Sequence, residues 1–194
     1  HCRKLNGTEE AKSTNSDIYV YEIATGQTVN HSAGMPGYDQ EPIFSPDSRY
    51  LAWTSMEKAG YEADRTRLMV LDLVTGQREE FTKGWKWECN SPQWAADGQS
   101  LFFLSSNDFT YQLYNIAVKD KKINRITEGI HDYHGFKIAG NELISARTAM
   151  NAPAEIFAVN MKTGAARQLT FVTGDVWNSV KKAKIERRTV RTTD

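Results

Sequence analysis

Side chains at residues 68–73 alternate between two faces if the chain is extended: Leu68, Val70 and Asp72 fall on one face, and Met69, Leu71 and Leu73 fall on the other. This alternation predicts a half-buried β-strand, because successive side chains of a strand point to opposite faces of its sheet. The pattern meets Thr75-Gly76-Gln77 and then resumes as a second short run that ends at Thr82. Glycine readily adopts the positive φ of a tight turn, so residues 68–82 are predicted to form a β-hairpin.

The hairpin pattern occurs four times, with first residues at Ile18, Leu68, Leu113 and Ile156, so that successive copies are offset by 50, 45 and 43 residues. A second recurring piece precedes the last three copies: a turn rich in Asp, Gly, Asn or Ser, followed by an apolar strand. Its copies are FSPDSRYLAWTS (44–55), WAADGQSLFFLS (94–105) and IAGNELISA (138–146). The two pieces together make a unit of four short antiparallel strands. Such a unit, repeated at this spacing, is typical of a β-propeller blade, because stacked blades cover the sheet faces that a lone blade leaves exposed.

The predicted fold class is therefore all-β, a partial β-propeller of about three and a half four-stranded antiparallel blades. The predicted segments are the end of a truncated blade at 1–32, blades at 41–82, 91–127 and 134–170, and an exit segment at 171–194 whose charged part, Lys181–Asp194, is read as strand-like. We expect Trp53, Leu71, Phe102, Phe103 and Val159 in the core. Known propellers have at least four blades, so the chain is expected to be a piece of something larger or to pair with another copy.

Charge and composition exclude several classes of function. The 24 basic and 24 acidic residues balance, which gives no electrostatic reason to expect nucleic acid as a partner. No apolar run approaches the ~20 residues of a membrane helix, and the polar sequence after His1 is unlike a signal peptide. The spacing of Cys2 and Cys89 matches no metal site; a disulfide between them is an alternative, but we favour two unrelated thiols. No cofactor is expected.

The strand order sorts the connections between strands onto two ends of each blade. Short SPDS-type and TGQ-type turns belong to one end, and longer, polar loops belong to the other, which is the candidate working face. The predicted long loops are Asn6–Ser16, Met56–Thr66, Lys83–Asn90, Glu128–His134 and Arg147–Ala154.

Three features of the sequence resemble the non-catalytic propeller of the prolyl-oligopeptidase family of serine peptidases, in its dipeptidyl-peptidase V and acylaminoacyl-peptidase-like branch. They are the repeated SPD and Thr-Gly turns, the insertion SMEKAGYEADRTRL at Ser55–Leu68, and the tail KIERRTVRTTD. The turns alone are shared with TolB-type propellers, so the insertion and the tail favour the peptidase. The resemblance covers nearly the whole chain.

The resemblance implies that the chemistry lies in an α/β-hydrolase domain with a Ser-His-Asp triad, outside this chain. No G-x-S-x-G motif occurs, so no catalytic residue is assigned, and we expect the chain alone to show no peptidase activity. By resemblance, the propeller would gate and orient short peptides for a serine exopeptidase in the periplasm or outside the cell. The alternatives are a TolB-like propeller that only binds a protein or peptide, and a propeller half that forms a homodimer through open blade edges. The sequence does not give the substrate specificity or the number of blades in the intact ring.

Two of the long loops carry the candidate substrate-binding residues, which are Glu57, Glu62, Asp64, Arg65, Trp85 and Trp87. One hypothesis is that Glu57, Glu62 or Asp64 binds the ammonium group of a peptide, because a carboxylate shielded from water binds a cation strongly. In the favoured alternative, Glu62 and Asp64 pair with Arg65 and Arg67 and stiffen the loop.

Aromatic and histidine residues give two weaker candidates on the same face. Trp85 and Trp87 could form an aromatic wall for peptide side chains, although packing between blades is favoured. His131-Asp132-Tyr133-His134 could hold a metal ion, but zinc needs three or four ligands and no partner cluster is evident, so no metal site is predicted. We expect these residues instead to hydrogen-bond neighbouring blades, with Tyr133 between sheets.

Overall fold

The computed structural model describes residues 2–4, 8, 11, 13 and 15–193, and of residues 2–4 the backbone only. The chain divides into two compact units, residues 1–127 and residues 128–194. The strands of each unit form antiparallel sheets, and each unit is described by itself.

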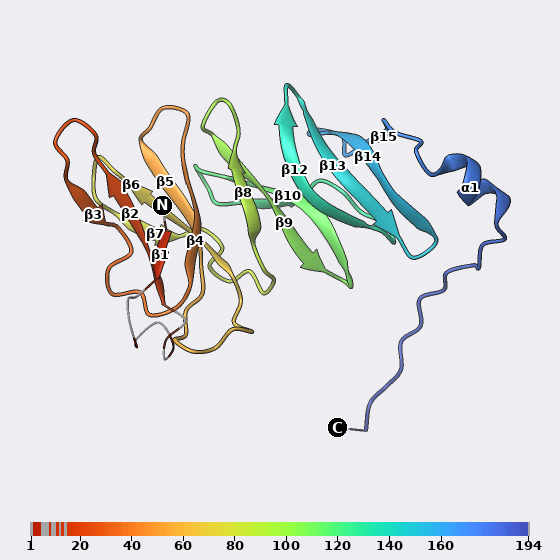
Figure 1. Ribbon diagram of the computed structural model, residues 1–194, viewed down its shortest axis with the longest axis horizontal. Helices are drawn as coiled ribbons and strands as arrows, with labels where there is room; N and C mark the ends of the chain where they lie inside the picture. Colours follow the sequence, from red (N-terminus) through yellow and green to blue (C-terminus); the bar gives the residue numbers. More distant parts are fainter. Residues whose placement is uncertain (1, 5–7, 9–10, 12, 14, 194) are drawn as a thin grey trace. The chain divides into compact units, whose positions relative to one another are not determined.

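The first unit contains three sheets, visible in Figure 1 from red through green. The first sheet has three strands in the order β1-β2-β3, and the others have four strands each, β4-β5-β6-β7 and β11-β10-β9-β8. The strands are β1 (Cys2–Lys4), β2 (Ser16–Tyr21), β3 (Thr28–Asn30), β4 (Asp39–Phe44), β5 (Tyr50–Ser55), β6 (Arg67–Asp72), β7 (Arg78–Glu80), β8 (Asn90–Trp94), β9 (Ser100–Asn107), β10 (Thr110–Ala117) and β11 (Ile123–Arg125).

The second unit contains one four-stranded sheet, a short helix and an extended tail. The sheet has the order β12-β13-β14-β15, from β12 (Asp132–Ala139), β13 (Glu142–Ala149), β14 (Ala152–Asn160) and β15 (Ala166–Gln168). The helix α1 spans Gly174–Ser179, and none of its residues is buried. Among the described residues, no helix is long and apolar enough to cross a bilayer.

Two of the predicted long loops in the second unit are wrong. Asp132, Tyr133 and His134 belong to β12, and the predicted loop Arg147–Ala154 is a tight hairpin in which Arg147 pairs with Glu155. Both segments are rich in polar residues, which is typical of loops. Each nevertheless forms backbone hydrogen bonds with a neighbouring strand, β12 with β13 and β13 with β14. The predicted loop Asn6–Ser16 falls largely outside the described residues.

The prediction that Lys181–Asp194 is strand-like is also wrong, as far as this segment is described. Residues 180–193 adopt no regular secondary structure, and almost all of them are exposed. An isolated extended segment gains no ladder of hydrogen bonds, and among the described residues no strand pairs with this one. The helix α1 was not predicted from the sequence.

The core of the first unit lies between sheets whose strands are apolar on both faces. Ala52 and Leu68 pack towards Phe103 and Tyr114 of the β8–β11 sheet. The residues next to them in sequence point the other way and pack against Ile18 of the β1–β3 sheet. Each predicted core residue is at most 6% exposed: Trp53, Leu71, Phe102 and Phe103 in the first unit, and Val159 in the second. The all-β, bladed architecture is thus confirmed.

One hydrogen bond recurs in all four sheets and explains a regularity of the repeats. The backbone N–H of the first apolar residue in each hairpin donates to a Ser or Thr hydroxyl fourteen residues later, at 2.9 Å in every copy. The pairs are Ile18 with Ser32, Leu68 with Thr82, Leu113 with Thr127, and Ile156 with Thr170. The short last strand of each hairpin ends before it reaches this N–H group, and the hydroxyl group accepts the hydrogen bond in place of a strand carbonyl. Each repeat therefore needs Ser or Thr at this position.

We expect Thr127→Val to lower the free energy of unfolding by about 1–3 kcal/mol, because it leaves the buried Leu113 N–H without an acceptor. Urea denaturation monitored by circular dichroism measures the loss. Thr127→Ser keeps the hydroxyl and serves as the matched control, with a smaller loss expected. Equal losses in the two variants would contradict a role for the hydrogen bond.

Candidate functional site

In the β4–β7 sheet, the short and long connections lie at opposite ends, as predicted. At one end, Arg49 and Asp72 form an ion pair of 2.8 Å, and the Leu73 N–H donates to the Arg49 carbonyl. At the other end, the loop 56–66 meets the loop after β7, where the Cys89 N–H donates to the Thr66 carbonyl at 3.0 Å. The candidate residues from the two long loops therefore come together at one end of this sheet.

Asp64 holds the loop 56–66 in shape from within. Its carboxylate accepts backbone N–H groups of Glu57 and Lys58, each at 2.9 Å, and of Arg65 at 3.0 Å. Although partial burial acts to raise it, these hydrogen bonds leave the pKa of Asp64 below its ordinary value. Asp64 is therefore engaged with the loop backbone.

Two arginines tie the same loop to the outer strand β7. Arg65 pairs with Glu80 at 2.7 Å, and Arg67 lies 3.9 Å from Glu80 and 3.6 Å from Glu57. The expected stiffening is present, but its carboxylate partners are Glu80 and Glu57 rather than Glu62 and Asp64. The side chain of Glu57 is 69% exposed, and Glu62 is exposed as well. Of the three predicted acidic candidates, Glu57 and Glu62 therefore have exposed carboxylates, whereas the carboxylate of Asp64 is bound to the loop backbone.

The two tryptophans of the second loop have different environments. Trp85 packs against the core between β4–β7 and β8–β11, with its ring edge-on to Tyr114 and its Nε1 3.3 Å from the Ser105 hydroxyl. Trp87 is 41% exposed. The favoured packing interpretation therefore fits Trp85, whereas Trp87 has surface available for a ligand.

The residues of the HDYH segment contact their own sheet. His134 Nε2 lies 2.6 Å from the Thr148 hydroxyl of the adjacent strand β13, and Tyr133 is 2% exposed beside the ring of His131. His134 was expected to hydrogen-bond a neighbouring blade, but its partner Thr148 belongs to the same sheet. Across the part of the chain that the structure describes, no three His, Cys, Asp or Glu side chains gather as metal ligands.

Cys89 is a free thiol and is completely buried, and burial raises its pKa. The side chain of Cys2 lies outside the described part of the chain. A buried neutral thiol is poorly reactive, so Cys89 is a core residue.

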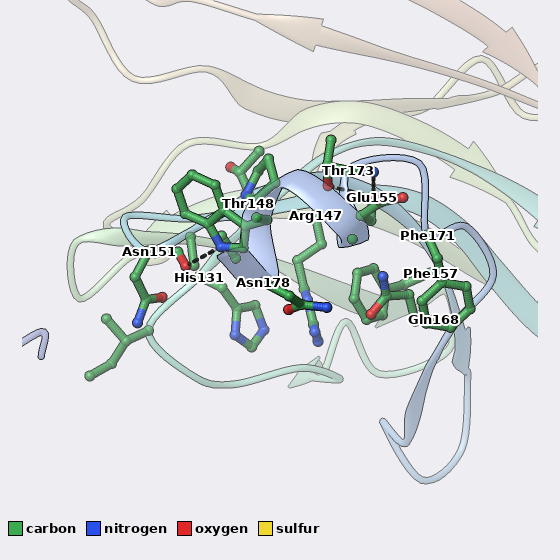
Figure 2. A pocket seen from close by; sticks show the side chains of 16 residues that line it. His131, Arg147, Thr148, Asn151, Glu155, Phe157, Gln168, Phe171, Thr173 and Asn178 are labelled. Atoms are coloured by element: carbon green, nitrogen blue, oxygen red, sulfur yellow. Dashed lines mark hydrogen bonds between the residues drawn. The ribbon is translucent and has the colours of Figure 1, made fainter. Parts of the chain in front are cut away.

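A pocket of about 560 Å³ lies in the second unit (Figure 2). It is bordered by the β13–β14 hairpin, the segment before β12, and α1. Its charged residues are Arg147 and Glu155, and its aromatic residues include Phe157 and Trp177. Arg147 begins one of the predicted long loops, but no motif marks Glu155, Phe157 or Trp177, and only the pairing of β13 with β14 brings Arg147 and Glu155 together.

The geometry thus defines a protein built from propeller-type blades with polar loops at one end. The family profile of the TolB β-propeller domain matches residues 9–180. The chain therefore belongs to the TolB β-propeller domain family.

Two relatives extend this match over nearly the whole chain. Dipeptidyl-peptidase 5 of Porphyromonas gingivalis is 38% identical over 192 residues, and Dipeptidyl-peptidase 5 of Porphyromonas endodontalis is 41% identical over the same length. Each alignment covers 99% of this chain but only 28% of the relative. The chain thus spans little more than a quarter of the length of these relatives.

Solved structures show the same fold. The acylaminoacyl peptidase of Pyrococcus horikoshii matches with a TM-score of 0.66 and 19% identity, over 86% of this chain and 24% of that protein. These findings confirm the predicted propeller fold and the resemblance to the propellers of this peptidase family.

Proposed function

We propose that this chain is the propeller part of a dipeptidyl-peptidase-type serine peptidase, and that it gates and orients short peptides for a hydrolase domain outside this sequence. The observation that carries the proposal is the 38–41% identity to Dipeptidyl-peptidase 5 across the full length of the chain. The polar loop end of the β4–β7 sheet supports it, because this end presents carboxylates on a restrained loop.

In this proposal, Glu57 and Glu62 hold the ammonium group of the peptide. A charge-assisted hydrogen bond of this kind contributes about 1.5–3 kcal/mol when water is largely excluded. The loop that carries both residues is held by Asp64, Arg65 and Arg67, so the carboxylates need little reordering on binding. The exposed ring of Trp87 would contact the side chains of the peptide.

The test uses the protein with its hydrolase segment and dipeptidyl amide substrates, which have a cleavable amide bond after the second residue and an amino terminus that is either free or acetylated. We expect the double variant Glu57→Gln/Glu62→Gln to raise KM for the free-amine substrate about 10-fold or more, because a loss of about 1.5 kcal/mol or more corresponds to at least a factor of ten. The acetylated substrate should be affected much less.

Glu22→Gln is the matched control, because Glu22 is an exposed carboxylate beside a Thr-Gly turn, the type of turn that lies opposite the long loops. An unchanged ratio of the two KM values in the double variant would contradict binding of the ammonium group. Absence of any hydrolase segment in the gene beyond Asp194 would contradict the peptidase proposal as a whole.

A second candidate function is that of a TolB-like propeller that only binds a protein or a peptide. The match of the TolB profile over residues 9–180 favours it. A gene that ends at Asp194 would support this candidate and remove the peptidase.

Two further parts of the proposal concern location and assembly. The peptidase resemblance favours a periplasmic or secreted protein, which fractionation of the source cells tests. A homodimer through open blade edges is supported by the exposed apolar residues Tyr21, Val29 and Phe44 near the β1–β3 sheet. Sedimentation that shows only monomers over a wide range of concentration would contradict the dimer.

A further inference from the structure

The pocket of the second unit has the size and lining of a site for a small organic ligand. Its volume of about 560 Å³ lies within the range of about 300–1,000 Å³ that is usual for such sites. Phe157, Phe171 and Trp177 supply apolar area, and Asn151 and Asn178 supply polar side chains. Figure 2 labels four of these side chains, which come from the β13–β14 hairpin (Asn151 and Phe157), from the segment after β15 (Phe171) and from α1 (Asn178).

Arg147 is the cation of this pocket. Its guanidinium carbon lies 3.5 Å from the centroid of the Phe157 ring, so one flat face of the group is stacked on the aromatic ring. Stacking leaves the N–H groups at the edge of the guanidinium available, in the planar fork that matches a carboxylate. Within the described part of the chain, no Asp or Glu lies within ion-pair distance of Arg147, although Glu155 is its register partner on β14.

Glu155 does not pair with Arg147, because its own oxygens are already bound. Oε2 accepts the hydroxyl of Thr170, and Oε1 accepts the Thr173 N–H at 2.9 Å and the Thr173 hydroxyl at 2.7 Å. These hydrogen bonds, that of Thr170 first, lower the pKa of Glu155 to about 2, so it stays ionised at neutral pH. The carboxylate of Glu155 is therefore hydrogen-bonded to the segment that follows β15 and not to Arg147.

Two other titratable groups border this region. Burial, with a smaller effect of the Arg147 charge, lowers the pKa of His131, which is therefore neutral at pH 7. Lys182 lies 5.7 Å from the centroid of the Trp177 ring and adds a second positive charge at the border of the pocket. The pocket lining therefore carries the positive charge of Arg147 and one carboxylate, Glu155, whose oxygens are engaged elsewhere.

We propose that this pocket binds a short peptide by its free C-terminal carboxylate, with the Arg147 guanidinium paired to the carboxylate and the last side chain, aromatic or branched, against Trp177 and Phe171. Asn151 and Asn178 would hydrogen-bond the peptide backbone. The inference concerns a different set of residues from Glu57 and Glu62 and does not depend on the proposed gating role.

The test is isothermal titration of the purified chain with the dipeptide Ala-Phe and with its C-terminal amide. We expect Ala-Phe to bind at least 10-fold more tightly than the amide, because only the carboxylate can form the paired hydrogen bonds with Arg147. Acetate serves as a probe without an apolar body and should bind at least 10-fold more weakly than Ala-Phe. Equal binding of the amide or of acetate would overturn the proposal, as would no binding of Ala-Phe.

Variants connect the binding to the residue. Arg147→Gln should weaken the binding of Ala-Phe at least 10-fold, and Arg147→Lys, which keeps the charge but loses the fork, should weaken it less. Arg167→Gln is the matched control, because Arg167 lies on β15 of the same sheet, pairs with Glu142 at 2.8 Å and does not line the pocket. Unchanged binding in Arg147→Gln, or an equal loss in Arg167→Gln, would overturn the proposal. Circular dichroism shows whether each variant is folded, and if Arg147→Gln is not, the comparison of Ala-Phe with its amide on the unaltered chain decides.

Discussion

Trp53→Ala is expected to lower the free energy of unfolding by about 3–5 kcal/mol, the largest effect of any single change considered for this chain. Trp53 is completely buried between the β1–β3 and β4–β7 sheets, where it packs with Ile18, Met35 and Leu71. Removal of the ring leaves a cavity, which the two sheets could close only by moving closer together and disturbing the packing of the residues around it. It also removes the indole N–H that donates to Asp39 Oδ1 at 3.0 Å. Urea denaturation followed by circular dichroism measures the change.

Two controls separate the cavity from the loss of the indole N–H. Trp53→Phe keeps most of the ring but not the N–H, so it should cost less than Trp53→Ala. Trp87→Ala removes a tryptophan that is 41% exposed and should cost about 1 kcal/mol or less. A loss for Trp53→Ala as small as that for Trp87→Ala would contradict the packing of these two sheets.

The second large effect is a pH dependence that originates at Asp39. Burial raises the pKa of Asp39 to about 6, and the hydrogen bond from Trp53 only partly offsets this. The Asp39 side chain is completely buried, and within the described residues Oδ2 has no hydrogen-bond partner. The neighbouring charge of Asp17 also favours the protonated form. The folded protein therefore binds this proton more tightly than the unfolded chain does.

The sign of the pH effect follows from this difference. The free energy of unfolding should fall as the pH rises from about 4 to about 7, by about 2–3 kcal/mol, and this contribution should stay constant above about pH 7. Urea denaturation at intervals of half a pH unit measures the slope.

Asp39→Asn should flatten this slope, because asparagine does not ionise. Asp47→Asn is the control: Asp47 lies in an exposed turn, where the hydrogen bond from Ser45 lowers its pKa, so its contribution changes only below about pH 4. A slope between pH 4 and pH 6 that persists in Asp39→Asn would contradict the assignment to this residue.

Much of the fold could be predicted because the repeats encode it locally. Alternation predicted strands such as β6, and Gly76, with φ of 73°, occupies the predicted turn. The third hairpin copy has Lys121 at the corresponding position, with φ of 55°, although a side chain is disfavoured there. The copy keeps its turn, and Lys121 Nζ pairs with Glu79 of the neighbouring sheet at 2.6 Å. This contact could not be read from the sequence.

The candidate site was only partly predictable. The loop 56–66 and its charged residues follow from their position between two strand patterns, but the role of Asp64 as an acceptor of three backbone N–H groups does not. The pairing of Arg65 and Arg67 with Glu80 depends on the strand β7 that lies beside them. The ranges Glu128–His134 and Arg147–Ala154, both predicted to lie on the working face, contribute to the pocket around Arg147. The pocket itself could not be predicted, because strands β14 and β15, the segment after β15 and α1 complete its lining.

The sequence by itself determined the four strand modules, their turns and the hydroxyl positions that close them, because these features depend on residues at most a few tens of positions apart. Tertiary structure alone decided where strands bulge: Glu41 and Ser91 adopt φ of 53°, at irregularities where β4 pairs with β5 and β8 with β9. It also decided which charges meet and which, among the described residues, have no ion-pair partner, as at Arg147. The physical reason is that alternation and turn chemistry act along the chain, whereas burial, register and charge pairing depend on what each face of a sheet meets in space.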